Sequence, residues 1–304
     1  MTTSHRLSRT HDGVVRLLAI GAVLLIIAGC ATAPSRDAIP PFRQGVVTVD
    51  QQTSATFADV NSFLRRQQIE RAMTKEALTE ELFFEALASA DLTKWDRAFA
   101  LIDSYAEKIE RLLNPDQRSG VEGELSVLGE KIEALREEQL PAGISAAFTK
   151  FGGLLVKLKV EHDALEAIRK ADPAIQEVFS AMMEAIGADP QAGVRGTVRT
   201  SWTQVLARID VRDFRRASSD DAKRAAVLRY VEALDERDVQ DRLLDSLRLS
   251  LATLAKAHQD LAHGRRGSAE TLIQLIQDEY KAYQEELKVL RERREGGLTS
   301  GGTT

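Results

Sequence analysis

Apolar residues recur at alternating spacings of three and four along most of the chain, which is the spacing of a helix that packs along one seam. One stripe covers residues 92–113 and stops before Asn114-Pro115, because proline cannot continue the hydrogen-bond ladder of a helix. Further stripes cover residues 121–135, 144–165, 175–186, 194–209 and 269–290. The pattern predicts a helix in each of these stretches.

The longest predicted helix begins after residue 218. Ser218-Ser219-Asp220-Asp221 supplies an N-cap and an acidic first turn. Neither proline nor glycine follows until Gly264, so one helix of roughly 65 Å is expected. The charged run 235–242 interrupts its seam and predicts a kink or an exposed waist. Gly264-Arg265-Arg266-Gly267 predicts a reversal into the last helix.

These elements predict an all-α fold, an elongated antiparallel helical bundle with long coiled-coil-like helices. We expect an N-terminal bundle over residues 51–188 and a C-terminal long-helix region over residues 189–295, which is either a second bundle or continuous with the first. Asp172-Pro173 is expected to open a short helix. Val46-Val47-Thr48-Val49 is the one candidate strand.

Both ends of the chain read differently from the middle. Residues 30–50 contain Pro34, Pro40 and Pro41, which predict a flexible tether. Residues 296–304 consist mainly of glycine, serine and threonine and predict a disordered tail.

The single cysteine rules out a disulfide within the chain. A net charge of -5 argues against a nucleic-acid partner, which would favour a basic surface.

Familiar catalytic motifs are absent from the sequence. It contains no P-loop, no His-Glu-x-x-His, no Gly-x-Ser-x-Gly and no calcium loop. The sequence therefore predicts a protein that is not an enzyme and that has no metal and no cofactor.

Two histidines are the weak exceptions, since His162 and His258 both occupy seam positions. One interpretation is that they face one core and bind a metal, haem or anion together with Met182 or Met183. The other is that each is a packed, hydrogen-bonded residue that sets helix register. We favour the second interpretation, because ligands inside a bundle usually come with carboxylates in the same seam.

The N-terminus carries the most informative motif. Arg6, Arg9 and Arg16 precede a charge-free apolar run over residues 17–29, which is too short to span a bilayer comfortably. Ile27-Ala28-Gly29-Cys30 resembles the lipobox of bacterial lipoproteins, with Ile in place of the usual Leu. The alternatives are an uncleaved anchor or an ordinary secretory signal.

The resemblance implies that residues 1–29 are a signal peptide and that Cys30 becomes the lipidated N-terminus, carrying acyl chains such as palmitate. Several acyl chains hold a protein stably at a membrane. Ala31, rather than Asp, follows the cysteine. In a Gram-negative cell this favours the outer membrane, facing the periplasm.

Three classes of function remain open. The first is a lipid-anchored, non-enzymatic scaffold or adaptor that binds a protein partner in the cell envelope. The second is a carrier that holds an apolar ligand in its core, and the third is a bundle that binds a metal or haem. The first leads, because it uses the anchor, the tether and the long helices together.

Overall fold

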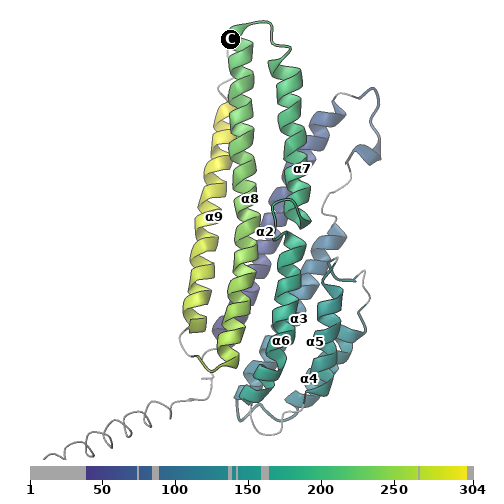
Figure 1. Ribbon diagram of the computed structural model, residues 1–304, viewed down its shortest axis with the longest axis vertical. Helices are drawn as coiled ribbons and strands as arrows, with labels where there is room; N and C mark the ends of the chain where they lie inside the picture. Colours follow the sequence, from purple (N-terminus) through teal and green to yellow (C-terminus); the bar gives the residue numbers. More distant parts are fainter. Residues whose placement is uncertain are drawn as a thin grey trace, which may run out of the picture.

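The repeating seams form helices that pack along one another. The computed structural model describes residues 39–73, 75–83, 89–135, 139–141, 143–158, 164–265 and 268–299. The described residues form an all-α bundle without strands (Figure 1). Its elements are α2 (Ile39–Ala72), the 3-10 helix η2 (Glu80–Phe83), α3 (Ser89–Leu113), α4 (Val121–Glu133), α5 (Ser145–Lys157), α6 (Ala164–Ile186), α7 (Gly193–Arg208), the π-helix η4 (Ile209–Phe214), α8 (Asp220–Ala262) and α9 (Ser268–Thr299).

Helix α8 is the longest element and runs through the whole bundle (Figure 1). It begins as expected, with the Ser219 hydroxyl accepting a hydrogen bond from the Ala222 backbone N–H at 3.2 Å. Helices α2 and α9 both pack against α8 and run antiparallel to it. Three polar pairs fix the α2–α8 register: Gln52–Ser246 (3.3 Å), Asp59–Gln240 (3.3 Å) and Arg66–Glu236 (3.2 Å).

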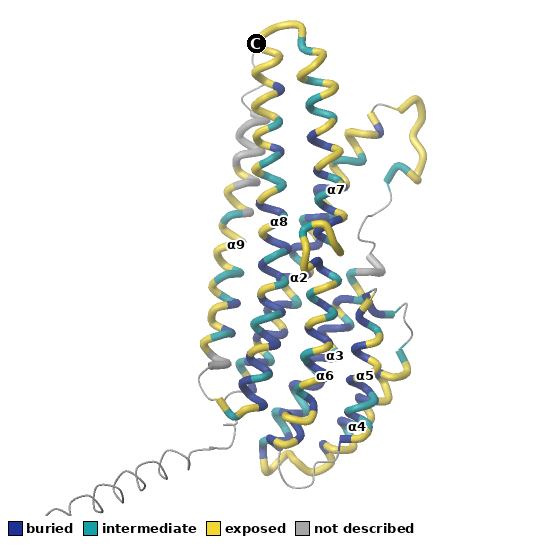
Figure 2. Tube along the Cα trace, in the orientation of Figure 1, coloured by how far each residue is buried: buried dark blue, intermediate teal, exposed yellow. Residues whose placement is uncertain are grey.

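One hydrophobic core joins the two halves of the chain. It holds side chains from every α-helix from α2 to α9, so no break falls between residues 188 and 189. Helices α3 to α6 form a second group beside the long helices α2 and α8, with α6 packed on α8 and α3 packed on α2. Figure 2 shows buried positions running along the facing sides of the helices. The described residues of the two halves therefore share a single core cluster.

The expected tether is wrong over residues 39–50. These residues form the first turns of α2, and Ile39, Phe42, Val46 and Val49 are buried. Pro40 and Pro41 fit because the first turn of a helix has no partners for its N–H groups, so proline removes no hydrogen bond there. The candidate strand at 46–49 is also wrong, because these residues belong to α2.

Gly45 shows how closely this segment packs against its neighbours. A methyl group there would lie 2.3 Å from Cδ1 of Ile273 and 2.9 Å from Cδ2 of Leu254. The absence of a side chain therefore lets α2 approach α8 and α9. Gly45 is therefore a packing residue.

Two helix boundaries also differ from expectation. The stripe over 144–165 belongs to two helices, since α5 ends at Lys157 and α6 begins at Ala164. Asp172-Pro173 opens no helix, because α6 continues through Pro173. The buried apolar face of α6 supplies the packing that outweighs the cost of an internal proline.

The ends of the chain fall partly outside the described residues. The expected tail is wrong over 296–299, where α9 continues to Thr299. Cys30 and the signal segment 1–29 lie outside the described residues, as does His162. No helix within the described ranges has the length and apolar content needed to span a bilayer.

Candidate functional site

His258 lies on α8 at the centre of the bundle, with 2% of its surface exposed. Three other helices contribute its neighbours. Phe42 of α2 meets the imidazole edge-on, with ring centroids 5.6 Å apart. Tyr105 of α3 and Asp172 of α6 bind its two nitrogen atoms. The seam position predicted from sequence is therefore a true core position.

The polar atoms of this cluster form a closed hydrogen-bond network. His258 Nδ1 lies 2.8 Å from Asp172 Oδ1, and Nε2 lies 3.0 Å from the Tyr105 hydroxyl. In the neutral imidazole, Nδ1–H donates to the carboxylate and Nε2 accepts from the tyrosine. Gln176 donates both to Asp172 Oδ1 (3.0 Å) and to the Ala255 carbonyl of α8 (2.8 Å).

The pKa values of the two acidic partners shift in opposite directions. Burial raises the pKa of the Tyr105 hydroxyl, and the charge of Asp172 raises it further. Burial also acts to raise the pKa of Asp172, but hydrogen bonds from His258 and Gln176 outweigh it and lower the pKa overall. The tyrosine therefore stays protonated and the aspartate stays ionised at neutral pH.

This order of groups is the one that a nucleophile, a base and an orienting carboxylate would have, but the network lacks access for a substrate. Tyr105 has 1% of its surface exposed. The gap beside the imidazole is lined by Phe42, Ile168 and Leu261 and leaves no room for a water molecule. The network is best understood as the polar centre that joins α2, α3, α6 and α8.

The metal hypothesis gains no support from this cluster. His258 has Tyr105 and Asp172 as its hydrogen-bond partners. Among the residues that the structure describes, no three His, Cys, Asp or Glu side chains are grouped so as to hold a metal ion. Because His162 lies outside those residues, its proposed pairing with His258 stays untested. Met182 is buried in α6, within the common core.

A second region of interest is the hairpin tip, which we define as residues 209–231 of η4, the following loop and the start of α8. Helix α2 ends at Ala72, where the charge of Glu70 still acts on Arg212 at the base of the tip, and the loop and the first residues of α8 extend further (Figure 1). Five large apolar side chains there are 40–58% exposed: Val211, Phe214, Val227, Leu228 and Val231. Such a concentration is typical of a binding surface.

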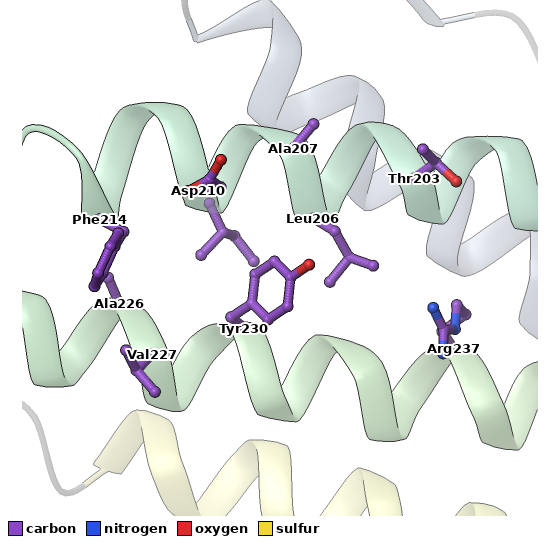
Figure 3. Close-up of a pocket in the computed structure, with 10 residues that line it drawn as sticks. Thr203, Leu206, Ala207, Asp210, Phe214, Ala226, Val227, Tyr230 and Arg237 are labelled. Atoms are coloured by element: carbon purple, nitrogen blue, oxygen red, sulfur yellow. The ribbon is translucent and has the colours of Figure 1, made fainter.

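A groove of about 580 Å³ lies between α7–η4 and α8 at this tip (Figure 3). Leu206 and Ala226 are buried in its lining, whereas Phe214 and Val227 are exposed. Its remaining lining residues are Thr203, Ala207, Ile209, Asp210, Tyr230 and Arg237. The α7 side ends in a π-helix, a feature that is frequent at functional sites.

The base of the hairpin is held rigidly. Arg195 of α7 is buried and donates to both oxygens of Asp241 (3.1 and 2.9 Å) and to Asp245 (2.9 Å) on α8. Burial acts to lower the pKa of Arg195, but the hydrogen bonds and charge of Asp241 outweigh it and raise the pKa. The indole N–H of Trp202 donates to Gln240 at 2.7 Å.

Sequence reasoning missed the groove. The one available clue was the phase of Val227 and Val231, which do not continue the later seam of α8. Arg212 and Arg215 near the groove pair with Asp213 (3.0 Å) and Asp210 (2.6 Å). No family model, no curated protein and no solved structure matches the chain, so its function is argued from its own geometry.

Proposed function

We propose that the protein is a lipid-anchored, non-enzymatic helical scaffold of the cell envelope that presents the hairpin tip to another envelope component. Cys30 carries the acyl chains, and the membrane is the outer membrane, facing the periplasm, where the cell is Gram-negative. The motif at Ile27-Ala28-Gly29-Cys30 supports the anchor. A scaffold of this kind needs a fixed end and a binding end.

The observation that carries the proposal is the position of the tip relative to the start of α2. Gly45 packs against Leu254 near the end of α8, whereas the tip includes the first residues of α8 (Figure 1). The 43 residues of α8 correspond to about 65 Å between its two ends. Only residues 31–38 separate Cys30 from Ile39 in the sequence, and this short spacing supports an anchor near the end opposite the tip.

The surface and the interior of the protein agree with a binding role. The tip exposes large apolar side chains that a soluble end without a partner would have little reason to keep. The polar network around His258, in contrast, is enclosed and saturated with hydrogen bonds. The binding end therefore offers recognition, and the interior offers rigidity.

Acylation and tip binding can be tested in the same cells. Metabolic labelling with a clickable fatty acid should label the wild type and not Cys30→Ser. A photo-crosslinking residue at Leu228, 58% exposed on the tip, should give a discrete crosslinked product. The same residue at Leu249, 43% exposed further along α8, is the matched control. Equal labelling of Cys30→Ser, or identical crosslinks from both positions, would contradict the proposal.

A further inference from the structure

We propose that the groove at the hairpin tip binds a single long-chain amphiphile with an anionic head, such as a free fatty acid or a lysophospholipid. The head lies at the Arg237 end, and the chain extends along the groove toward Phe214. The inference rests on the proposed function in one respect, because it names the chemistry of the component that the scaffold's tip binds.

The size and the lining of the groove fit such a ligand. Its volume of about 580 Å³ lies within the range of roughly 300–1,000 Å³ that is usual for small-molecule sites. Leu206 and Ala226 form a buried apolar floor, and the exposed side chains of Phe214 and Val227 flank it. This is an elongated apolar channel with an open side, which an acyl chain can fill.

Within the described part of the chain, two polar side chains that line the groove keep an unused hydrogen-bond donor. The Tyr230 hydroxyl makes no hydrogen bond, and Figure 3 shows the tyrosine projecting into the space between α7 and α8. Arg237 uses Nε (2.9 Å) and Nη2 (2.8 Å) on one oxygen of Asp238, which leaves Nη1 free. A hydroxyl and a guanidinium N–H that line one apolar groove suit an anionic oxygen.

Charge also sets the direction of the ligand. Asp210 lies toward the Phe214 end of the groove, and Arg237 lies at the other end (Figure 3). Asp210 already accepts a hydrogen bond from Arg215 (2.6 Å) and offers no donor to an anionic head, whereas Arg237 still offers its Nη1 N–H. The chain therefore points toward Phe214, where Val227 supplies further apolar contact.

The dimensions favour an acyl chain over a helix from a partner protein. A helix is about 10 Å across with its side chains, whereas the buried apolar floor of the groove consists of only Leu206 and Ala226. An acyl chain has a much smaller cross-section.

Displacement of a fluorescent fatty acid from purified residues 31–304 tests the site, since the described core starts at Ile39 and lies within that chain. Palmitate should compete saturably, and hexadecanol, with the same chain and no charge, should compete more weakly. Arg237→Gln should weaken palmitate about tenfold and leave hexadecanol unchanged. Val227→Asp should weaken both, and Leu249→Asp, at an exposed position outside the groove, should weaken neither.

Several outcomes would overturn the inference. These are the absence of saturable palmitate binding, binding that Arg237→Gln and Val227→Asp both leave unchanged, and flotation with phosphatidylglycerol vesicles that Val227→Asp does not reduce. The last outcome would indicate a lipid surface in place of a single ligand. Circular dichroism confirms that each variant is folded. Acylation of Cys30 and crosslinking from Leu228 are independent of these results, so failure of the groove is distinguishable from failure of the scaffold.

Discussion

The imidazole of His258 is bound on both sides, by Tyr105 through Nε2 and by Asp172 through Nδ1. Removal of the ring would leave the buried Tyr105 hydroxyl without its partner and the half-buried Asp172 carboxylate with the hydrogen bond from Gln176. Buried polar groups that lose a partner typically cost about 1–3 kcal/mol. A single histidine therefore links the stability of four helices, although it has no access to solvent.

We predict that His258→Gln lowers the free energy of unfolding by about 1–3 kcal/mol, because glutamine can restore only part of the network. Urea unfolding followed by circular dichroism measures the change. His263→Gln is the control, since His263 is exposed and bonds only to the Gln259 carbonyl of its own helix. A loss of bound metal in the His258 variant would contradict the structural role.

The side chain of Asp50 makes the stability of the protein depend on pH. Burial raises its pKa from 3.8 to about 6, helped by the charges of Asp96 and Asp103, and its Oδ1 is buried without a hydrogen bond. Because the pKa is higher in the folded state, stability is greatest below pH 4 and is lost as the pH rises through about 6. A pKa shift of this size corresponds to a loss of almost 3 kcal/mol in the free energy of unfolding for a fully buried group. Because Asp50 is only half-buried, we expect a loss of about 1 kcal/mol.

Asp50→Asn is therefore expected to be more stable than the wild type at pH 7 by about 1 kcal/mol. The two proteins should have nearly equal stability below pH 4, where the aspartate is neutral in both states. Urea unfolding across pH 4–8 gives the comparison. A constant difference at every pH would show that the amide acts through packing and that the carboxylate charge has no part in it.

At the scale of elements, the adjacent glycines of α5 have different roles. A methyl at Gly152 would lie 2.9 Å from the Gly129 carbonyl oxygen and 3.0 Å from Cβ of Ile132, both on α4. A methyl at Gly153 would meet only the end of the flexible Glu133 side chain, at 2.9 Å. The close crossing of α4 and α5 therefore requires the first glycine and not the second.

Gly152→Ala should consequently destabilise the protein by about 1–3 kcal/mol, because the crossing must widen. Gly153→Ala should be neutral or stabilising by up to about 1 kcal/mol, since alanine favours the helix. The pair is its own matched control in thermal unfolding. Equal effects of both substitutions would indicate that helix propensity, and not the α4–α5 contact, decides the outcome.

Periodicity predicts an element well where one seam faces one neighbour. The stripes of α3 and α4 end within two residues of the structural boundaries. Punctuation by proline was less reliable, because Pro40 and Pro41 fall in a first turn and Pro173 is held by a buried face. The effect of a proline on a helix depends on its position in the helix and on the residues that pack around it, and the local sequence does not specify that packing.

Polar runs were misread for a related reason. The charged run 235–242 predicts a kink or an exposed waist, yet Gln240 is buried and binds Trp202, and Asp241 binds Arg195. The network around His258 and the groove were likewise out of reach of the sequence. Each depends on which helices become neighbours, and spacing along one helix carries no such information.

At the scale of the whole molecule, one core makes the body cooperative while the tip lies outside it. Leu244, Leu247, Leu251 and Leu254 of α8 are completely buried, whereas Ala226 is the only fully buried position among the first eleven residues of α8. Local opening is cheapest where few apolar contacts must break. The tip should therefore open without unfolding of the rest.

We predict that amides of residues 222–231 exchange with deuterium at least a hundredfold faster than those of residues 244–258, which corresponds to about 3 kcal/mol less opening free energy. Residues 39–188 and 189–299 should instead unfold in one denaturant transition, because α2 and α6 bury their faces on α8. Hydrogen exchange by mass spectrometry and urea unfolding measure the two quantities. Separate transitions for the two halves would refute the single core. Uniform protection along α8 would mean that the tip is already covered. A ligand or partner retained in the groove during purification would explain such protection. Exchange measured after delipidation should then be faster at the tip.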